Sequence, residues 1–358
     1  MSHLDPELVR ARKRAVGNSP VRLTSNENRM GLPPEVRAAL LDAFSDSHIY
    51  PDDSSLHLTR ALARRHGVEP DAIVHSHGST DLLRMVVSAH ALEARLLRIA
   101  LAEPTFEHLV EYARPFRPQL FRLPLTSKGW AHDLPGMEEA LATEEGPALI
   151  YICNPNNPTG TLTPSAQIEE WIRRAPEDHL FVVDEAYFEY VEDPSHRSLD
   201  QWAGERPNVV VLRTFSKVYG MAGVRVGYAV AHPDTAARLR WFRSERGANH
   251  LGNMGALAAL AHPEIISRAL AANRASKNVV YGVLDELGLE YMESHTNFVM
   301  HQVNGPAERY VERMEEAGFL VGRPFPSFPT HNRISLGTPA EMRSWAEALR
   351  QFRREGWV

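Results

Sequence analysis

The chain has 358 residues, 43% of them hydrophobic, which is enough to bury a large core and suggests one large domain with a smaller one. Its formal net charge of −6 gives no electrostatic reason to expect nucleic acid or an anionic membrane as a partner. The single cysteine, the absence of a signal-peptide pattern in residues 1–18 and the lack of any run of about 20 apolar residues predict a cytoplasmic protein.

The hydrophobic pattern predicts an α/β fold. Between Ile73 and Val230, strand-like apolar runs alternate with amphipathic stretches, which is typical of a mostly parallel sheet flanked by helices. From about Pro263 to Gly288 an unbroken helical pattern predicts a long connecting helix. Beyond it, Tyr291 to Val303, Ala307 to Gly318 and Pro339 to Phe352 predict a strand, a helix and a terminal helix.

The segment His77 to Leu83 predicts an anion site. Gly78, Ser79 and Thr80 lie where a loop opens a helix. Free backbone N–H groups and the positive end of the helix dipole attract an anion there, and the two hydroxyls add donors. Taken alone, such a run is more often an ordinary helix cap.

Two later segments follow apolar strands. Asn154 to Gly160 comes after the strand Ala148 to Cys153, and its prolines and glycine predict a rigid turn that presents the Asn157 amide. Phe181 to Tyr187 carries Asp184 at the end of a strand, where ligands of open α/β sheets gather. Taken alone, the first is a turn and the second is equally typical of a helix N-cap.

Lys217 is the most informative residue of the chain. It is one of four lysines, and it lies between the apolar run Val209 to Leu212 and a glycine-rich turn that ends in Arg225. A desolvated amine has a lowered pKa and becomes a nucleophile toward carbonyls, which a Schiff-base lysine for pyridoxal phosphate requires. Alone, Lys217 is more typical of a surface lysine at a strand end.

With Lys217, the other segments form a complete set for this cofactor. Asp184 can pair with the pyridine nitrogen and keep it protonated, so that the ring accepts electrons. Tyr187 and Asn157 can hydrogen-bond the phenolic oxygen of the ring. The predicted phosphate ligands are Ser79, Thr80, Thr214, Ser216 and Arg225, and the last of these offers a bidentate guanidinium.

Three residues invite other chemistry. His75 and His77 are a close pair whose side chains point the same way on a strand, but no carboxylate or thiol lies at ligand spacing, so we expect no metal site. Cys153 ends a strand and is more typical of a small core residue than of a nucleophile.

In chain order, these segments resemble the fold-type I pyridoxal phosphate enzymes of the class I/II aminotransferases, and most closely histidinol-phosphate aminotransferase and its relatives. The similarity covers nearly the whole chain and rests on seven ordered motifs, far more specific together than any one alone. They are Leu23 to Asn28, Tyr50-Pro51, Pro104 to Phe106, the Asn157 turn, Asp184, Lys217 and Asn332 to Thr338.

The resemblance implies further roles and an assembly. Lys217 binds the cofactor and shuttles the Cα proton, and Phe106 stacks on the cofactor ring. Tyr50 reaches into the neighbouring subunit's site, which implies a homodimer with shared sites. It also implies an aspartate-aminotransferase-like division into a large cofactor-binding domain, residues 30–275, and a small α+β domain of residues 1–29 and 276–358 that includes the N-terminal arm.

The candidates for substrate binding are Arg333, Arg323, Asn26 and Arg29. By resemblance, Arg333 binds a substrate carboxylate or phosphate. Arg323 is either the second arginine of a phosphate pair or a solvated strand end. Two departures count against histidinol phosphate itself. The chain has Arg29 where the family usually has proline after Asn-Glu-Asn, and its arm lacks a tyrosine before Asn26. Arg29 either selects a distal anion or faces water, and the second is typical of a loop arginine.

The sequence and the resemblance therefore predict a pyridoxal phosphate-dependent aminotransferase that moves an amino group between an amino acid or amino-alcohol phosphate and a 2-oxo acid. Another Cα chemistry on the same scaffold, such as decarboxylation or an oxygen-using oxidase or hydroxylase, uses the same cofactor residues. A non-catalytic regulator would need an appended DNA-binding segment, and we expect no room for one before Leu23.

Overall fold

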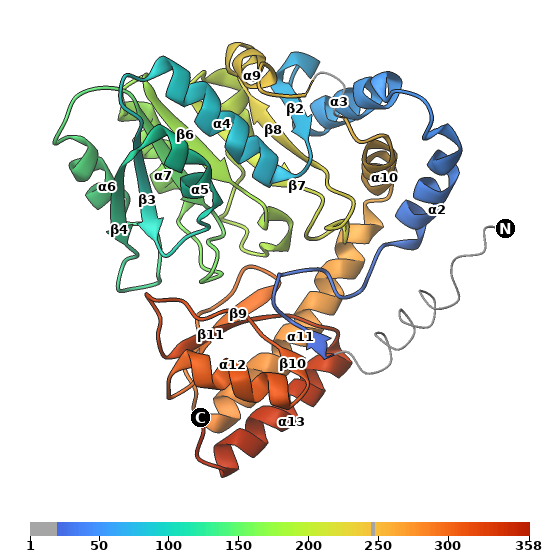
Figure 1. The fold of residues 1–358 in the computed structure, drawn as a ribbon, viewed down its shortest axis with the longest axis vertical. Helices are drawn as coiled ribbons and strands as arrows, with labels where there is room; N and C mark the ends of the chain where they lie inside the picture. The colour runs from blue at the N-terminus through green and yellow to red at the C-terminus, as the bar shows by residue number, and fades with distance from the viewer. Residues whose placement is uncertain (1–19, 245–247) are drawn as a thin grey trace.

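The computed structural model describes residues 20–244 and 248–358, which form a large lobe and a small lobe (Figure 1). The large lobe is built on a seven-stranded sheet in the order β2-β8-β7-β6-β5-β3-β4. All neighbours pair in parallel except at β8, which is antiparallel to both β2 and β7. The strands are β2 (Ile73–Ser76), β3 (Arg98–Glu103), β4 (Gln119–Pro124), β5 (Ala148–Cys153), β6 (His179–Asp184), β7 (Val209–Thr214) and β8 (Gly227–Ala231).

Helices cover both faces of this sheet, because the central strands β5 to β7 are apolar along most of their length and bury both sides. One face packs against α3 (Asp52–His66), α6 (Leu134–Leu141), α7 (Ser165–Arg174), α8 (Asp200–Glu205) and α10 (His250–Ala261). The other packs against α4 (Ser79–Glu93), α5 (His108–Ala113) and α9 (Pro233–Arg240). The predicted α/β class, a mostly parallel sheet flanked by helices, is confirmed.

The small lobe has its own core, around Trp345, Tyr310 and Ile334. Its antiparallel pair is β9 (Phe298–Gln302) with β11 (His331–Ser335), and its parallel pair joins β1 (Val21–Arg22), from the N-terminal arm, to β10 (Phe319–Leu320). The helices α12 (Ala307–Glu316) and α13 (Pro339–Arg354) complete it. Figure 1 shows the blue N-terminal strand beside these red and orange elements.

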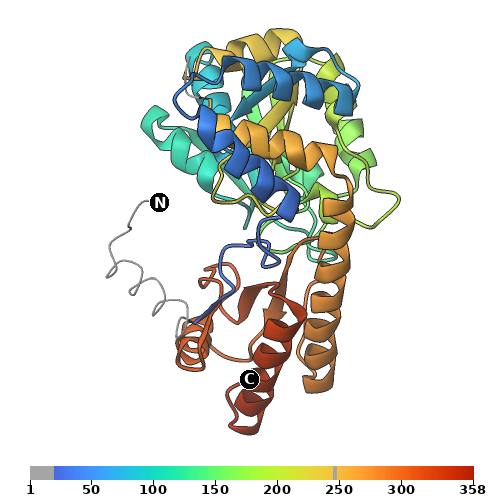
Figure 2. The same cartoon turned by 90° about the vertical axis from the view of Figure 1, so that its right-hand side faces the viewer.

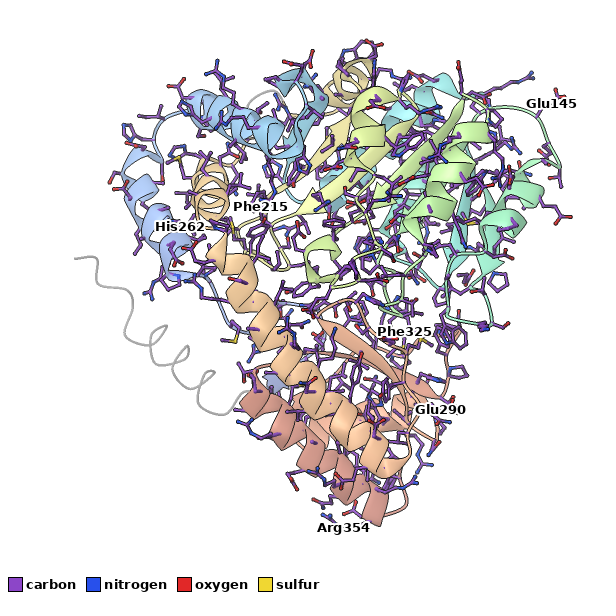
Figure 3. The ribbon with its side chains drawn as sticks, turned by 180° about the vertical axis from the view of Figure 1, so that it is seen from behind. Glu145, Phe215, His262, Glu290, Phe325 and Arg354 are labelled. Carbon is purple, nitrogen blue, oxygen red and sulfur yellow. The ribbon has the colours of Figure 1, made fainter. Side chains whose placement is uncertain are left out.

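A long helix, α11 (Glu264–Leu287), links the lobes. It runs from the large lobe down the length of the small one, beside α13 (Figure 2). Figure 3 labels His262 just before its start and Glu290 just after its end. The predicted connecting helix is therefore confirmed.

The predicted strand Tyr291 to Val303 is wrong in its first half. The strand proper is Phe298–Gln302, and Tyr291 makes only an isolated bridge to His301. Between them, the Ser294 hydroxyl accepts from the Thr296 N–H, and the Thr296 hydroxyl accepts from the Phe298 N–H. Such local bonds from side chain to backbone compete with strand pairing.

The division at residues 29/30 and 275/276 remains a prediction, and position 275 lies inside α11. Residues 1–19, which include most of the predicted arm and the segment without a signal-peptide pattern, lie outside the described residues. Within the described part of the chain, no helix combines the length and the apolar character needed to cross a membrane.

Candidate active site

A cavity of about 380 Å³ lies where β5, β6 and β7 end, beside the start of α4 and against β11 of the small lobe. This size suits a small-molecule ligand. The predicted site residues that line it are Asn26, Ser79, Thr80, Phe106, Asn157, Asp184, Tyr187, Thr214, Ser216, Lys217, Arg225 and Arg333. Segments far apart in the sequence therefore meet in one place.

Lys217 lies three residues beyond β7. Its Nζ donates to the Ser25 carbonyl at 3.3 Å and lies 5.5 Å from the centre of the Tyr187 ring. Burial, helped by the charge of Arg333, lowers the pKa of Lys217 to about 8. The unprotonated fraction of this amine near neutral pH is therefore much larger than that of an ordinary lysine, and the unprotonated form is the nucleophile toward a carbonyl.

Asp184 ends β6 and is almost completely buried. Its Oδ2 accepts from the Tyr151 hydroxyl at 3.0 Å, and its Oδ1 accepts from the Ala186 N–H at 3.1 Å. Burial raises the pKa of Asp184 to about 6, against the lowering effect of these two donors. Among the described residues, these neutral groups are the hydrogen-bond donors to the carboxylate, and a protonated ring nitrogen would supply a cationic one.

Asn157 and Tyr187 both line the cavity. The Asn157 Oδ1 accepts from Arg333 at 2.6 Å, so its Nδ2 group is the part that can donate to a ligand. The Tyr187 hydroxyl accepts from the Asn26 Nδ2 at 3.0 Å and still has its own hydrogen to donate. Asn26 itself is buried and also accepts from the Ser335 hydroxyl at 2.8 Å.

The start of α4 and Arg225 line the cavity together. No side chain caps this helix. Gly78 has a φ of +92°, which L side chains rarely adopt, and a Cβ on Gly227 would lie 2.4 Å from the Ser79 backbone N, so glycine is needed at both positions. The Arg225 Nη1 donates to the Ser216 hydroxyl at 3.2 Å. An uncapped helix N-terminus beside a guanidinium is a site for a phosphate.

Phe106 lines the cavity wall, and its ring stacks on His108 at 4.6 Å with an interplanar angle of 13°. Thr105 fixes the loop that carries it, because the Thr105 hydroxyl donates to the Asn156 Oδ1 at 2.7 Å. The loop after β3 is thus tied to the turn after β5.

Arg333 reaches the cavity from β11. Its Nη1 donates to Asn157 and its Nη2 to the Thr24 carbonyl at 2.6 Å, while its Nε is buried without a hydrogen-bond partner among the described residues. Its guanidinium lies 5.6 Å from the Phe325 ring, and Figure 3 labels Phe325 near the boundary of the two lobes. A buried donor without a partner points to a ligand that carries an acceptor.

Four other predicted residues, Gly78, Tyr50, Arg323 and Arg29, are not among those lining the cavity. Tyr50 lies on the surface with 65% of its area exposed. Arg323 forms an ion pair with Glu107 at 3.0 Å, and Arg29 forms one with Glu341 at 2.5 Å. The roles predicted for these residues remain predictions, as do those of the residues that line the cavity.

The cavity also has lining residues that were not predicted to bind a ligand. Thr24, Ser25, Glu27, His108, Cys153, Ala186 and Ala222 also line the cavity. Glu27 lies between Asn26 and Asn28 in the motif Leu23 to Asn28, and this position could have indicated that it lines the site. Tyr151, which donates to Asp184, has a weaker signal, two residues before the end of its strand on the face of Cys153.

The donor set fits pyridoxal phosphate. It offers an anion site at one end, a buried carboxylate for a ring nitrogen, an amide and a phenol for a ring oxygen, and an amine of lowered pKa. For a metal, the compact group of candidate ligands in residues 20–244 and 248–358 is Glu35, His262 and Glu264, outside this cavity. There Glu35 already accepts two hydrogen bonds from Arg268, at 2.8 and 2.9 Å.

Comparisons with known proteins agree with this geometry. The family described as aminotransferase class I and II matches residues 18–349. A histidinol-phosphate aminotransferase from Symbiobacterium thermophilum is 37% identical over 94% of this chain and 91% of its own length. The crystal structure of histidinol-phosphate aminotransferase from Sinorhizobium meliloti with pyridoxal-5'-phosphate has a TM-score of 0.86 and 28% identity, covering 99% of this chain and 96% of that one. Aspartate aminotransferase from Thermus thermophilus with maleate shares the fold, with a TM-score of 0.81 at 22% identity, covering 99% and 97% of the two chains.

Proposed function

Because the chain belongs to the aminotransferase class I and II family, we propose that it transfers an amino group from a phosphorylated amino alcohol, with histidinol phosphate as the reference donor, to a 2-oxo acid. Membership of the family makes it an enzyme that uses pyridoxal phosphate. The choice of amino donor rests on Arg333, which lines the same cavity as Lys217. Its Nε is a buried hydrogen-bond donor without a partner among the described residues, so it can bind an anion of the substrate. A phosphate as this anion is supported by the relatives named histidinol-phosphate aminotransferase.

The chain's residues divide the work of this reaction. When bound, pyridoxal phosphate supplies an electron sink for the bond that breaks at the donor's Cα. Lys217 Nζ, whose pKa is lowered to about 8, takes the Cα proton and holds it. Asp184 holds a proton on the ring nitrogen, and Arg333 orients the donor by its anion.

The remaining residues hold the cofactor in place. Asn157 and Tyr187 donate to the ring oxygen, and Phe106 stacks on the ring. Arg225, with the start of α4 and the hydroxyls of Ser79, Thr80, Thr214 and Ser216, holds the phosphate.

A half-reaction screen tests the proposal. The holoenzyme is mixed with one amino donor at a time, without an acceptor, and the loss of the absorbance band of lysine-bound cofactor is followed. Histidinol phosphate should convert the band at least about 10²-fold faster than histidinol, because only the phosphate forms charge-assisted bonds with an arginine. A faster reaction with free amino acids would refute the choice of donor. Release of carbon dioxide or hydrogen peroxide would instead favour a decarboxylase or an oxidase.

We propose also that the active unit is a homodimer. The segment from α2 (Pro34–Ala43) to the first turn of α3 exposes large apolar side chains. They are Leu41, Phe44, Ile49, Tyr50 and Leu56, with exposed fractions from 45% to 65%. A second copy that covers this surface would remove it from water and bring Tyr50 to the neighbouring site.

Mixing two inactive variants tests this assembly. Lys217→Ala lacks the reactive amine, and Tyr50→Ala lacks the phenol that is proposed to enter the neighbouring subunit's site. After subunit exchange, a hybrid dimer has one site with Lys217 from one chain and Tyr50 from the other. Equal mixing should restore about a quarter of wild-type activity, since half of the dimers are hybrids with one intact site. No recovery after exchange verified by mass spectrometry would contradict shared sites.

A cytoplasmic location is part of the proposal. Its support is the single cysteine, Cys153, which is buried and cannot form an internal disulfide. Fractionation of the native cells with an antibody against this chain would test it.

A further inference from the structure

A completely buried tyrosine lies directly behind the carboxylate of the site. Tyr151 is in β5, is 0% exposed and is not among the residues that line the cavity. Its hydroxyl donates to the Asp184 Oδ2 at 3.0 Å. The other oxygen, Oδ1, accepts only from the Ala186 N–H at 3.1 Å among the described residues. Each carboxylate oxygen therefore has one donor from the protein.

The register of the sheet produces this contact. In the parallel pair of β5 and β6, Cys153 lies opposite Asp184, and Tyr151 lies opposite Val182. Side chains alternate between the faces of a sheet, so Tyr151, Cys153 and Asp184 share one face. Diagonal neighbours on a face are within reach of a long aromatic side chain. A phenol two residues before the strand end therefore meets the carboxylate at the end of the next strand.

The direction of this hydrogen bond is fixed by burial. Burial and the nearby Asp184 charge raise the pKa of Tyr151 well above its ordinary value, so the phenol keeps its proton and can only donate to the carboxylate. Burial raises the pKa of Asp184 to about 6, and the Tyr151 hydroxyl is the largest of the effects that lower it.

Other charged or titratable groups also act on Asp184. Lys217 favours its ionised form, and Glu185 opposes it. The Cys153 thiol adjoins Tyr151 on β5, and burial raises its pKa too, so it stays neutral. Tyr151 is thus the neutral side-chain donor among them, and its contribution does not depend on which substrate is bound.

We propose that Tyr151 is a positioning residue for amino transfer, because its hydroxyl fixes one oxygen of Asp184 and keeps the carboxyl ionised to receive a protonated ring nitrogen. The inference rests on the proposed function, since it assigns Asp184 to the cofactor ring. Without the hydroxyl, Asp184 takes up a proton at higher pH and its carboxyl is free to turn about its side-chain bond. A neutral carboxyl no longer holds the proton on the ring nitrogen.

The test begins with the cofactor-free protein. Tyr151→Phe removes only the hydroxyl, and the titration of Asp184 is followed by the infrared band of the protonated carboxyl, assigned by its loss in Asp184→Asn. In wild type the midpoint should lie near the pKa of about 6. In Tyr151→Phe it should move up by roughly half to one pH unit, the worth of one hydrogen bond. Tyr310→Phe is the matched control. It also removes a buried tyrosine hydroxyl, but this one accepts from the Trp345 Nε1 in the small lobe.

The holoenzyme gives a second readout. Tyr151→Phe should weaken pyridoxal phosphate binding roughly 3- to 10-fold and lower kcat about tenfold, with the acid limb of the kcat profile moved to higher pH. The KM of the donor should not change, because Tyr151 lies outside the cavity. A role in packing alone would change the unfolding temperature without moving the carboxyl titration.

Two results would overturn the inference. One is a folded Tyr151→Phe whose carboxyl titration matches that of Tyr310→Phe. If Tyr151→Phe does not fold, 3-fluorotyrosine at position 151 replaces it, since the more acidic phenol is a stronger donor and should move the midpoint to lower pH. The second result is a carboxyl titration midpoint that does not shift with fluorotyrosine. The titration uses no cofactor and no donor, so failure of histidinol phosphate as a donor leaves this result standing.

Discussion

The cofactor end of the cavity and two arginines proposed to bind the donor are held in different ways. At the cofactor end, Asp184 is buried between two neutral donors, and Arg225 is bonded to a hydroxyl and to the Ala222 carbonyl. Arg323 and Arg29 are not among the residues that line the cavity, and they lie in ion pairs with Glu107 and Glu341 that are partly or largely exposed to water.

This difference predicts how strongly a substitution in each group of residues should affect activity. Buried hydrogen bonds between neutral and charged groups are costly to break, because the partner left behind has no water to replace them. Exposed ion pairs are worth only about 0–1 kcal/mol and exchange partners readily. We infer that substitutions of the buried cofactor residues lower activity more than substitutions of Arg323 and Arg29 do.

The largest effect is expected for Lys217→Ala. Without its amine the chain cannot bind the cofactor covalently, so the absorbance band of lysine-bound cofactor and turnover should both be lost while the protein stays folded. Lys277→Ala is the control, since this partly buried lysine donates to the Ser294 carbonyl away from the cavity lining. Retention of the band by Lys217→Ala would show that another amine is used.

Asp184→Ala comes next. The cofactor should still bind to Lys217, but kcat should fall by roughly 10²–10⁴-fold, because a ring nitrogen without its proton makes a poor electron sink. The measurement is a comparison of the cofactor dissociation constant with kcat. Asp193→Ala, an exposed carboxylate bonded to Ser195, should behave as wild type. Wild-type turnover by Asp184→Ala would remove its assigned role.

Arg333→Ala should lower kcat/KM for the true donor by at least about 10²-fold, since two charge-assisted bonds at ~1.5–3 kcal/mol each are lost. The cofactor band should not change. Arg333→Lys should restore only part of the loss, because a point charge lacks the guanidinium fork. Steady-state kinetics beside the control Arg309→Ala, an exposed arginine on α12, measure the effect. Equal kinetics in Arg333→Ala and Arg309→Ala would show that the donor does not bind at Arg333.

Arg323→Ala should have a smaller effect that reports the class of donor. If the donor is phosphorylated, the guanidinium exchanges Glu107 for the phosphate, and kcat/KM should fall about tenfold or more. Glu107→Gln, which removes the competing carboxylate, should then lower KM for the same donor. With a free amino acid as donor, neither substitution should change the kinetics more than about threefold, the range of an exposed pair.

The smallest effect is expected for Arg29→Ala. Its guanidinium is paired with Glu341, which also caps α13 by accepting from the Thr338 N–H at 2.8 Å. Removing Arg29 should lower the unfolding temperature slightly and change donor kcat/KM less than about threefold, as for other exposed pairs. A change in donor preference would show that Arg29 takes part in substrate binding.

Much of the fold could be predicted because strands and helices follow from local hydrophobic patterns. The apolar run Ala148 to Cys153 is a strand with these same bounds, and the helical pattern from Pro263 to Gly288 is α11 within a residue at each end. The segment Tyr291 to Val303 failed because hydroxyls of Ser294 and Thr296 take over backbone N–H groups, and hydrophobic periodicity does not record such bonds.

The sequence by itself determined the chemical groups of the site, since Lys217, Asp184, Asn157 and Arg225 each follow a recognisable local signal. Only the tertiary structure decided their partners. Asn26 meets Tyr187 across 161 residues of chain, and Arg29 meets Glu341 across 312. Tyr151 reaches Asp184 because of one particular register between two strands. Spacing in a sequence records interactions within a helix turn or along a strand, whereas contacts between distant segments arise only when strands pair and lobes pack.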